Sequence, residues 1–193
     1  MCKGVLDLAQ HKQQLRQETI AARQNLPTHV WQGYSQSICH RLAEWEPILT
    51  AHIILAYISF RQEPDLSYLC QKFPDKVWGF PRCTGKGLDW HQVNPTYLSQ
   101  GTEVGKYGIV EPLTSLPKVD MREVDVVLVP SVACDRQGYR LGYGGGFYDR
   151  FLAKRSLYTV GITFADYHLD RLPSETWDVP LNAVCTEVGI QLI

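Results

Sequence analysis

The sequence predicts an α/β fold in which a largely parallel sheet is flanked by helices, and three observations support this prediction. Two continuous apolar runs of strand length, residues 52–58 and 124–130, are typical of strands covered on both faces. Helical patterns alternate with such strands along the chain. No internal repeat or linker divides the 193 residues, so we expect a single domain spanning 1–193.

Two helices are predicted before the first strand. The first covers residues 5–26, with Pro27 as its stop. Its apolar residues at helical spacing are Val5, Leu8, Leu15, Ala22 and Leu26. The second runs from Thr28, as its N-cap, to about Glu46, because Pro47 follows.

The later elements alternate in type. They are a helix at 65–73, strands at 76–80 and 88–93, a helix at about 147–155, a strand at 158–164 and a final strand near 183–192. The stretch 94–120 contains three prolines and three glycines, so we expect it to be mostly loop.

Composition limits the class of protein. A net charge of −1 and a pI near 6.6 give no basic field, so we expect no nucleic-acid or membrane binding. No apolar run approaches the roughly 20 residues that span a bilayer, and the N-terminus lacks the apolar core of a secretory signal. The cysteines are scattered without a C-x-x-C pair, which predicts reduced thiols in a cytoplasmic protein. They are Cys2, Cys39, Cys70, Cys83, Cys134 and Cys185.

A glycine-rich segment at 138–150 is the most informative part of the sequence. It follows a buried strand and opens a helix, so it lies outside the carboxyl end of a strand, where open α/β sheets bind ligands. Glycine lets backbone N–H groups approach an anion, and Arg140 adds a bidentate contact to phosphate oxygens. A tight turn is the alternative, but a turn needs only one or two glycines. We therefore expect a phosphate-binding loop.

The segment matches neither common nucleotide fingerprint. G-x-G-x-x-G requires glycine where Phe147 stands, and the P-loop pattern requires a lysine that this segment lacks. Asp149, in the first turn of the next helix, has two interpretations. It is either an acid that complements the helix N-terminus or a ligand of Mg²⁺, which takes one or two carboxylates plus phosphate oxygens.

Three cations share one sector of the first predicted helix. Lys12, Arg16 and Arg23 lie four and seven residues apart, beside the apolar residues. They form either a solvated basic face or a row that points into a cleft. The residues alone do not decide between these two, and we treat Arg23 as a surface residue. Likewise, Glu63 before Pro64 is by itself a helix N-terminal signal.

Together these segments resemble the 5-formyltetrahydrofolate cyclo-ligase family. The strongest match is the run G-Y-R-L-G-Y-G-G-G-F-Y-D-R at 138–150, with Pro130 and Asp135 before it. The segments K-Y-G-I-V-E-P at 106–112 and P-S-E-T-W-D-V-P-L-N at 173–182 also resemble elements of that family, as does Thr186-Glu187. The resemblance covers nearly the whole chain and implies a three-layer sandwich of the NagB/RpiA/CoA-transferase-like type.

The resemblance also implies a reaction. Such an enzyme uses ATP and Mg²⁺ to close 5-formyltetrahydrofolate into 5,10-methenyltetrahydrofolate, through phosphorylation of the formyl oxygen and release of ADP and phosphate. Phosphoryl transfer requires mainly alignment and charge neutralisation, so we expect no essential general base. A carboxylate suits the pterin, whose edge presents neighbouring N–H donors.

Each candidate residue takes its role from the resemblance. Arg140 and Tyr148 are the candidates for acting on the reacting groups, although Tyr148 also fits a helix-packing aromatic. The magnesium candidates are Asp149 and Asp178; the latter, without the resemblance, is a loop acid. The ATP candidates are Lys12, Arg16, Arg140, Leu141, Gly142, Tyr143, Gly144, Gly145, Gly146, Phe147 and Tyr148. The folate candidates are Arg16, Ile58, Glu63, Tyr143, Gly144, Gly145, Gly146 and Phe147.

Some positions depart from the family's pattern. They are Ser131 and Cys134 before the loop, Gly145 where some relatives carry lysine, Tyr167 in place of a common glutamine, and Asn182 in place of an aspartate. These departures bear on the pocket near Tyr167 and Cys134 and leave the glycine-rich run intact.

Two alternatives stay open. One is a related α/β enzyme that acts on a phosphorylated sugar or a coenzyme A thioester through a catalytic carboxylate, without ATP. The other is a non-catalytic folate- or nucleotide-binding protein. For the cyclo-ligase we expect a monomer whose partners are the folate substrate and ATP.

Overall fold

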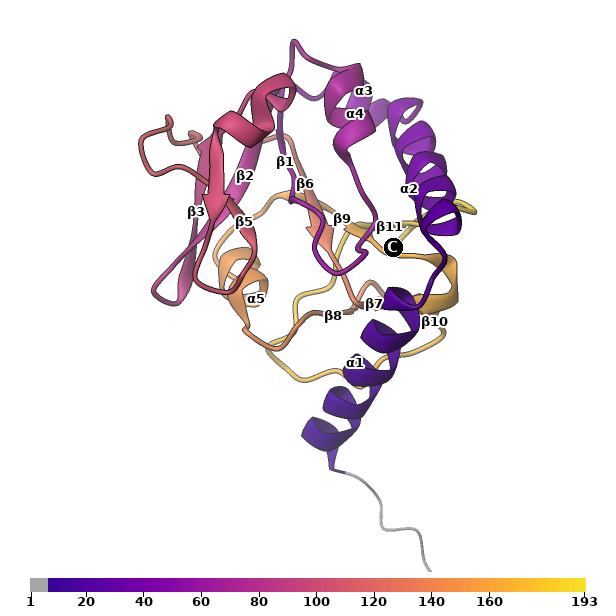
Figure 1. Cartoon of the computed structure of the whole chain (residues 1–193). Helices are drawn as coiled ribbons and strands as arrows, with labels where there is room; N and C mark the ends of the chain where they lie inside the picture. The colour runs from indigo at the N-terminus through magenta and orange to yellow at the C-terminus, as the bar shows by residue number, and fades with distance from the viewer. Residues whose placement is uncertain (1–6) are drawn as a thin grey trace, which may run out of the picture.

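A central sheet organises the computed structural model, which describes residues 7–193 (Figure 1). Within these residues the largest sheet has seven strands, in the order β12-β11-β9-β6-β1-β2-β3. The inner strands run parallel, and β3 and β12 are antiparallel edges. The strands are β1 (Ile53–Leu55), β2 (Val77–Thr84), β3 (Gly87–Gln92), β6 (Val126–Pro130), β9 (Tyr158–Ile162), β11 (Ala183–Cys185) and β12 (Ile190–Leu192).

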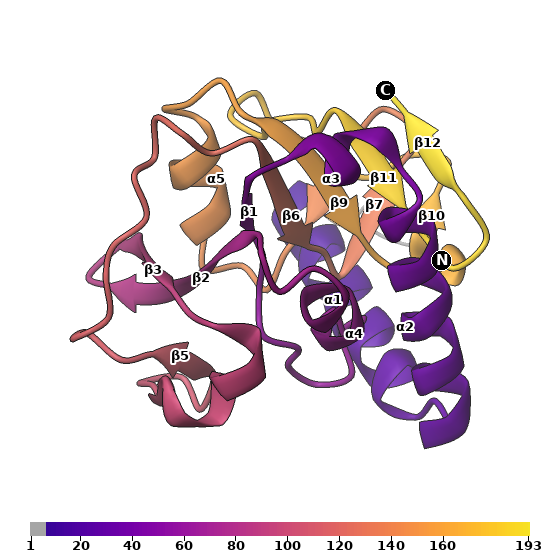
Figure 2. The same cartoon turned by 90° about the horizontal axis from the view of Figure 1, so that it is seen from above.

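Helices cover both faces of this sheet, as Figure 2 shows. The helices α2 (Thr28–Ala43), α3 (Glu46–Thr50) and α4 (Ser67–Lys72) pack on one face, and α5 (Phe147–Leu152) packs on the other. Along the inner strands, successive side chains alternate between the two layers, as in a buried parallel sheet. The predicted α/β class with a largely parallel sheet is therefore confirmed.

A second, three-stranded sheet lies beside the first helix, α1 (Leu8–Gln24). Its strands are β7 (Ala133–Asp135), β8 (Arg140–Leu141) and β10 (His168–Leu169). Leu15 and Ile20 of α1 pack against its small core, which includes Leu141. In Figure 1 this helix runs beneath the central sheet, next to β7, β8 and β10. The glycine-rich segment was expected to join a buried strand directly to a helix. In the structure, the short strands β7 and β8 lie between the buried strand β6 and helix α5.

Helix boundaries differ from the predicted ones near polar caps and prolines. Asp7 caps α1, and its Oδ1 accepts a hydrogen bond from the Gln10 backbone N–H at 2.7 Å; Val5 lies outside the described residues. The N-cap of α2 is Pro27 and not Thr28. Pro47 does not stop α2, which ends earlier; it lies in the first turn of α3, where its missing N–H costs nothing.

Two predicted segments contain more structure than expected. The stretch 94–120 holds the 3-10 helix η1 (Pro95–Gln100) and the hairpin of β4 (Thr102–Val104) and β5 (Val110–Pro112). The predicted last strand is two antiparallel strands, β11 and β12. The turn between them is closed by Thr186, whose hydroxyl hydrogen-bonds to Gly189. Short strands of three residues leave too little alternation to be seen in a sequence.

The predicted apolar face of α1 is only partly confirmed: Leu15 and Leu26 pack against the core clusters, but Leu8 and Ala22 do not. Leu8 is 41% exposed and Ala22 is exposed, whereas Thr19 and Arg23 are the residues of this helix that are buried. The helix lies against polar loops as well as the small sheet, so its inner side carries cations. This places Lys12, Arg16 and Arg23 within the molecule rather than on a solvated face.

The departures from the family's pattern have structural roles. Asn182 takes part in joining β9 to β11, because its Oδ1 accepts hydrogen bonds from the backbone N–H and the hydroxyl of Thr159, both at 2.9 Å. Cys134 is fully buried, and Tyr167 packs between two apolar clusters. Among residues 7–193 the cysteines are free thiols, and in that range no helix combines the length and apolar character needed to cross a membrane.

Candidate active site

The glycine-rich loop joins β8 to α5 in a backbone conformation that glycine favours. Gly144 has φ = 92° and Gly146 has φ = 65°, a region that side chains rarely adopt. A Cβ atom at Gly146 would lie 2.5 Å from Nη1 of Arg150. A Cβ atom at Gly144 would lie 3.4 Å from Cζ of Arg16. The loop therefore lies against arginine side chains on two sides, and its positive φ angles are what favour glycine at these positions.

Arg140 and the first turn of α5 form a buried ionic cluster. Nη2 of Arg140 donates to Oδ1 of Asp149 at 2.5 Å, and the Arg140 side chain is only 4% exposed. The guanidinium also lies 5.5 Å from the centre of the Tyr148 ring. Nε of Arg140 and the hydroxyl of Tyr148 are buried without a hydrogen-bond partner in the described residues. Burial raises the pKa of Tyr148, so this phenol stays protonated and has a free proton to donate.

Lys12 on α1 lies between two carboxylates of the segment that precedes β11. Its Nζ donates to Oε2 of Glu175 at 2.9 Å and to Oδ2 of Asp178 at 2.6 Å. Burial lowers the pKa of Lys12, but the hydrogen bonds and charges of Asp178 and Glu175 outweigh burial, so its pKa is raised. Lys12 therefore stays charged.

Arg16, one turn further along α1, contacts the glycine-rich loop. Its Nε donates to the carbonyl oxygen of Gly142 at 2.6 Å. Burial lowers the pKa of Arg16, and the nearby charge of Asp149 partly opposes this effect. One face of α1 thus places Lys12 against Asp178 and Arg16 beside Asp149, as the four-residue spacing predicts.

Glu63 provides a buried carboxylate next to this cluster. It is 4% exposed, and its Oε2 accepts a hydrogen bond from the backbone N–H of Phe60 at 3.1 Å. Burial raises the pKa of Glu63 to about 7, although the charge of Arg23, the Phe60 N–H and the Tyr143 hydroxyl all act to lower it. Ile58 lies on the same segment, partly buried against the core beneath α2.

Arg23 is not the surface residue that the sequence suggested. It is 1% exposed, its Nη2 donates to the hydroxyl of Tyr143, and its Nε donates to the carbonyl oxygen of Arg61 at 3.1 Å. It therefore connects α1 to both the glycine-rich loop and the turn that holds Glu63. The spacing of Arg23 from Arg16 was the signal that could have assigned it.

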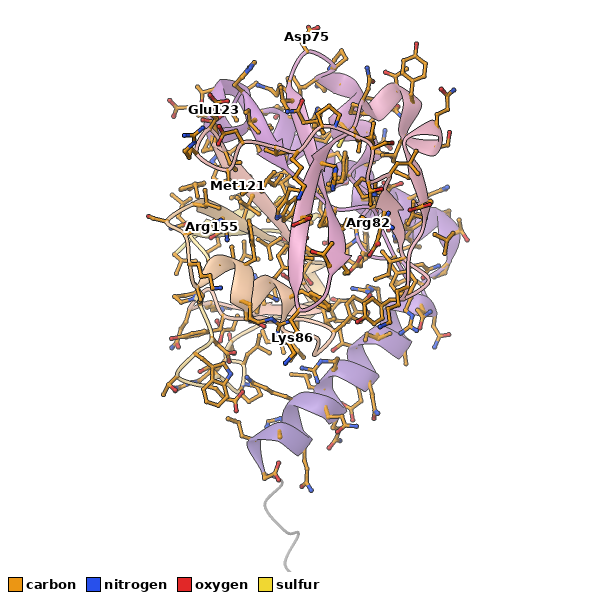
Figure 3. All side chains as sticks on the ribbon, turned by 90° about the vertical axis from the view of Figure 1, so that its left-hand side faces the viewer. Asp75, Arg82, Lys86, Met121, Glu123 and Arg155 are labelled. Atoms are coloured by element: carbon orange, nitrogen blue, oxygen red, sulfur yellow. The ribbon has the colours of Figure 1, made fainter. Side chains whose placement is uncertain are left out.

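Further residues brace the glycine-rich loop. Nη2 of Arg150 donates to the carbonyl oxygen of Gly145 at 2.8 Å, and its Nε donates to that of Lys86 at 2.7 Å. Figure 3 shows Lys86 at the tip of the β2–β3 hairpin, beside α5. On the other side, the Phe147 ring meets the Tyr107 ring edge-on, with centroids 5.9 Å apart. Arg150 and Tyr107 lie in segments that carry the family resemblance, but the sequence predicted no role for either residue.

The structure also bears on three further candidates: Leu141 for ATP, and Asp149 and Asp178 for the metal. The Leu141 side chain is buried in the small sheet, so only its backbone is left to contact a nucleotide. Within residues 7–193 there is no cluster of three or more His, Cys, Asp or Glu side chains that could hold a metal ion. Asp149 and Asp178 each use only one carboxylate oxygen in hydrogen bonds within the described chain.

These features define the class of protein as an α/β protein in which a glycine-rich loop, contacted by arginine side chains, lies beside a buried carboxylate. A model of the 5-formyltetrahydrofolate cyclo-ligase family matches residues 8–187. The 5-formyltetrahydrofolate cyclo-ligase of Escherichia coli K12 is 30% identical over 178 residues, covering 85% of this chain and 93% of that protein. The Mycolicibacterium smegmatis enzyme of the same name is 31% identical over 187 residues, covering 91% and 93%.

A solved structure agrees with this assignment. The NMR structure of Aquifex aeolicus 5,10-methenyltetrahydrofolate synthetase superimposes with a TM-score of 0.81 at 29% identity, covering 94% of this chain and 92% of that one. The chain belongs to the 5-formyltetrahydrofolate cyclo-ligase family, and it is an enzyme of that class.

Proposed function

We propose that the chain performs the reaction of its family by transferring the γ-phosphoryl group of ATP to the formyl oxygen of 5-formyltetrahydrofolate. The observation that supports this most directly is the arrangement on α1. One helix face places Lys12 beside Asp178 and Arg16 beside the glycine-rich loop, so two cations lie next to a backbone whose N–H groups suit a polyphosphate.

The proposed roles follow from these contacts. Lys12, Arg16, Arg140 and the loop amides bind the phosphates, and the buried Tyr148 hydroxyl donates to the formyl oxygen or the transferred phosphoryl group. Glu63 accepts the neighbouring N–H donors of the pterin, with Ile58 and the loop residues 143–147 beside it.

The chemical steps balance without a general base from the protein. The formyl oxygen attacks the γ-phosphorus, the bond to the β-phosphate oxygen breaks, and ADP leaves. N10 then attacks the activated formyl carbon, the carbon–oxygen bond breaks, and phosphate departs as the proton of N10 is lost. The chain contributes alignment and charge neutralisation, the main requirements of phosphoryl transfer.

The residues fit a magnesium ion that is shared with ATP. Asp149 and Asp178 are hard oxygen ligands, and each has one oxygen that is not engaged within residues 7–193. Mg²⁺ commonly takes one or two carboxylates with phosphate oxygens and waters, so a protein-only cage is not required. When bound, the ion would supply neutralisation of phosphate charge.

The test measures the near-ultraviolet absorbance of the methenyl product with purified protein, 5-formyltetrahydrofolate and Mg²⁺, with and without ATP. We expect the band to grow only when ATP is present. Growth without ATP would contradict the phosphoryl-transfer step. No growth, with calorimetry still showing folate or ATP binding, would favour the non-catalytic binding protein.

Replacing Lys12 with methionine is expected to weaken ATP binding about tenfold or more, because it removes a charge-assisted contact to phosphate. Isothermal titration with Mg-ATP measures this directly. Lys118→Met is the matched control, because Lys118 pairs with Asp89 in an exposed salt bridge on another part of the surface. An unchanged dissociation constant in Lys12→Met would limit Lys12 to a structural contact with Glu175 and Asp178.

We further propose that the chain acts in the cytoplasm as a monomer with one catalytic domain over residues 1–193. The free thiols of the described cysteines support a reducing compartment. The candidate residues of α1, the loop and the 175–178 segment all come from one chain, so the proposed site needs no second copy. Sedimentation of the purified protein checks the oligomeric state.

A further inference from the structure

Arg23 connects three segments that are far apart in the sequence. From α1 it donates to the Tyr143 hydroxyl on the glycine-rich loop and to the Arg61 carbonyl oxygen after β1. Its guanidinium carbon lies 5.8 Å from the centre of the Tyr143 ring. The turn that it holds is strained, since Arg61 and Gln62 have φ values of 49° and 54° without being glycine.

This guanidinium is buried without an ion pair. No carboxylate within residues 7–193 lies inside 4.0 Å of it, and its Nη1 has no hydrogen-bond partner there. Burying an unpaired charge costs several kcal/mol or more. Fold stability alone therefore gives no reason for a cation at this position, because an apolar residue would be cheaper.

Glu63 is the acidic group on which this charge acts. Contacts join Arg23 to the turn that holds this carboxylate: the Phe60 N–H donates to Glu63, the Tyr143 hydroxyl donates to the Phe60 carbonyl oxygen, and Arg23 donates to the Arg61 carbonyl oxygen. Within the described chain, the side chains that interact electrostatically with the Glu63 carboxylate include Arg23 of α1, Tyr143 of the loop, Tyr57 after β1 and Tyr148 of α5. Of these four, only Arg23 carries a positive charge. Burial favours a protonated carboxyl group, whereas the charge of Arg23, the Phe60 N–H and the Tyr143 hydroxyl favour the carboxylate.

We propose that Arg23 is a positioning residue, which keeps Glu63 available as a carboxylate for the pterin and draws the glycine-rich loop toward the folate side through Tyr143. This inference rests on the proposed role of Glu63 in folate binding. A protonated Glu63 accepts one N–H less well and donates where the pterin also donates, so folate affinity falls with its protonation.

The experiment measures the pH profile of KM for 5-formyltetrahydrofolate at saturating Mg-ATP. In the unaltered enzyme, KM falls as the pH rises through about 7, the pKa of Glu63. In Arg23→Met the midpoint moves up by about one pH unit, so KM rises about fivefold at neutral pH and returns to the unaltered value near pH 9. Arg23→Lys retains the charge and keeps the midpoint.

A merely structural role for Arg23 predicts another result. Arg23→Met would then lower the melting temperature and kcat at every pH and leave the midpoint unchanged, which overturns the proposal. If Arg23→Met does not fold, Arg23→Gln retains polar contacts but lacks the charge, and it is expected to give the same shift. Tyr143→Phe removes only the phenol hydrogen bond at a residue that is 38% exposed, and it is expected to give a smaller upward shift.

The outcomes separate this inference from the proposed function. If Glu63→Gln leaves KM and its pH profile unchanged, Glu63 does not bind folate. In that case both the proposed folate role of Glu63 and the inference on Arg23 fail. If Glu63→Gln abolishes the pH dependence while the Arg23 variants leave the midpoint in place, the role of Glu63 stands and only the inference on Arg23 fails.

Discussion

Arg140→Ala is expected to lower kcat/KM for ATP-dependent product formation by about 100- to 1000-fold, the usual effect of removing a donor that stabilises developing charge. The Arg140 side chain is 4% exposed, touches Asp149 and lies over the Tyr148 ring. Its loss would leave the first turn of α5 without its cation, and in the proposed site it would also leave the phosphoryl group without one. The measurement is steady-state absorbance of the methenyl product at varied ATP.

Two variants control this experiment. Arg140→Lys retains the charge but not the planar fork, so its activity is expected to fall between that of the alanine variant and the unaltered enzyme. Arg122→Ala removes a largely exposed arginine whose salt bridge to Asp120 lies on the surface, and it is expected to change nothing. Equal activity in Arg140→Ala and Arg122→Ala would exclude Arg140 from the reaction.

Glu63→Gln is expected to raise KM for 5-formyltetrahydrofolate by about 100-fold or more, because it removes the charged acceptor of two proposed hydrogen bonds, each worth about 1.5–3 kcal/mol. ATP binding should stay within about twofold, because in the proposed site Glu63 contacts the folate and not the phosphates. Calorimetry with each ligand separates the two effects. A parallel loss of ATP affinity would instead indicate that Glu63 supports the glycine-rich loop.

The carboxyl group of Glu63 also determines the direction in which the free energy of unfolding changes with pH. Burial raises the pKa of Glu63 from 4.5 to about 7 in the folded chain, so the folded state binds a proton more tightly than the unfolded chain. The stabilisation from this proton is fully present below about pH 4.5 and is lost as the pH rises through 7. Glu63→Gln removes this contribution.

The sequence predicted an element correctly where a single physical signal dominates that segment. The strands β1 and β6 were predicted because continuous apolar runs are rare outside buried sheets. The glycine-rich loop was found because positive φ angles at Gly144 and Gly146 leave few other residues usable. The resemblance to the family was strongest in the same run.

The inner face of α1 could not be assigned from the sequence alone. Helical periodicity shows which residues share a side, but not what that side meets. Leu8 is exposed and Arg23 is buried because polar loops, and not an apolar sheet, lie over this part of the helix. The two short strands β7 and β8 were missed because strands of two or three residues carry no period.

The ion pairs of Lys12 with Asp178 and of Arg140 with Asp149 also affect how an empty site appears to an approaching nucleotide. Each pair behaves at long range as a dipole, whose field decays faster than that of a single charge. Attraction of bare ATP from a distance is therefore weak, and the carboxylates would repel its phosphates at contact. In the proposed site, a nucleotide that arrives with its divalent counterion would exchange partners with both pairs, so the proposed roles of these residues favour the metal complex of the nucleotide over bare ATP.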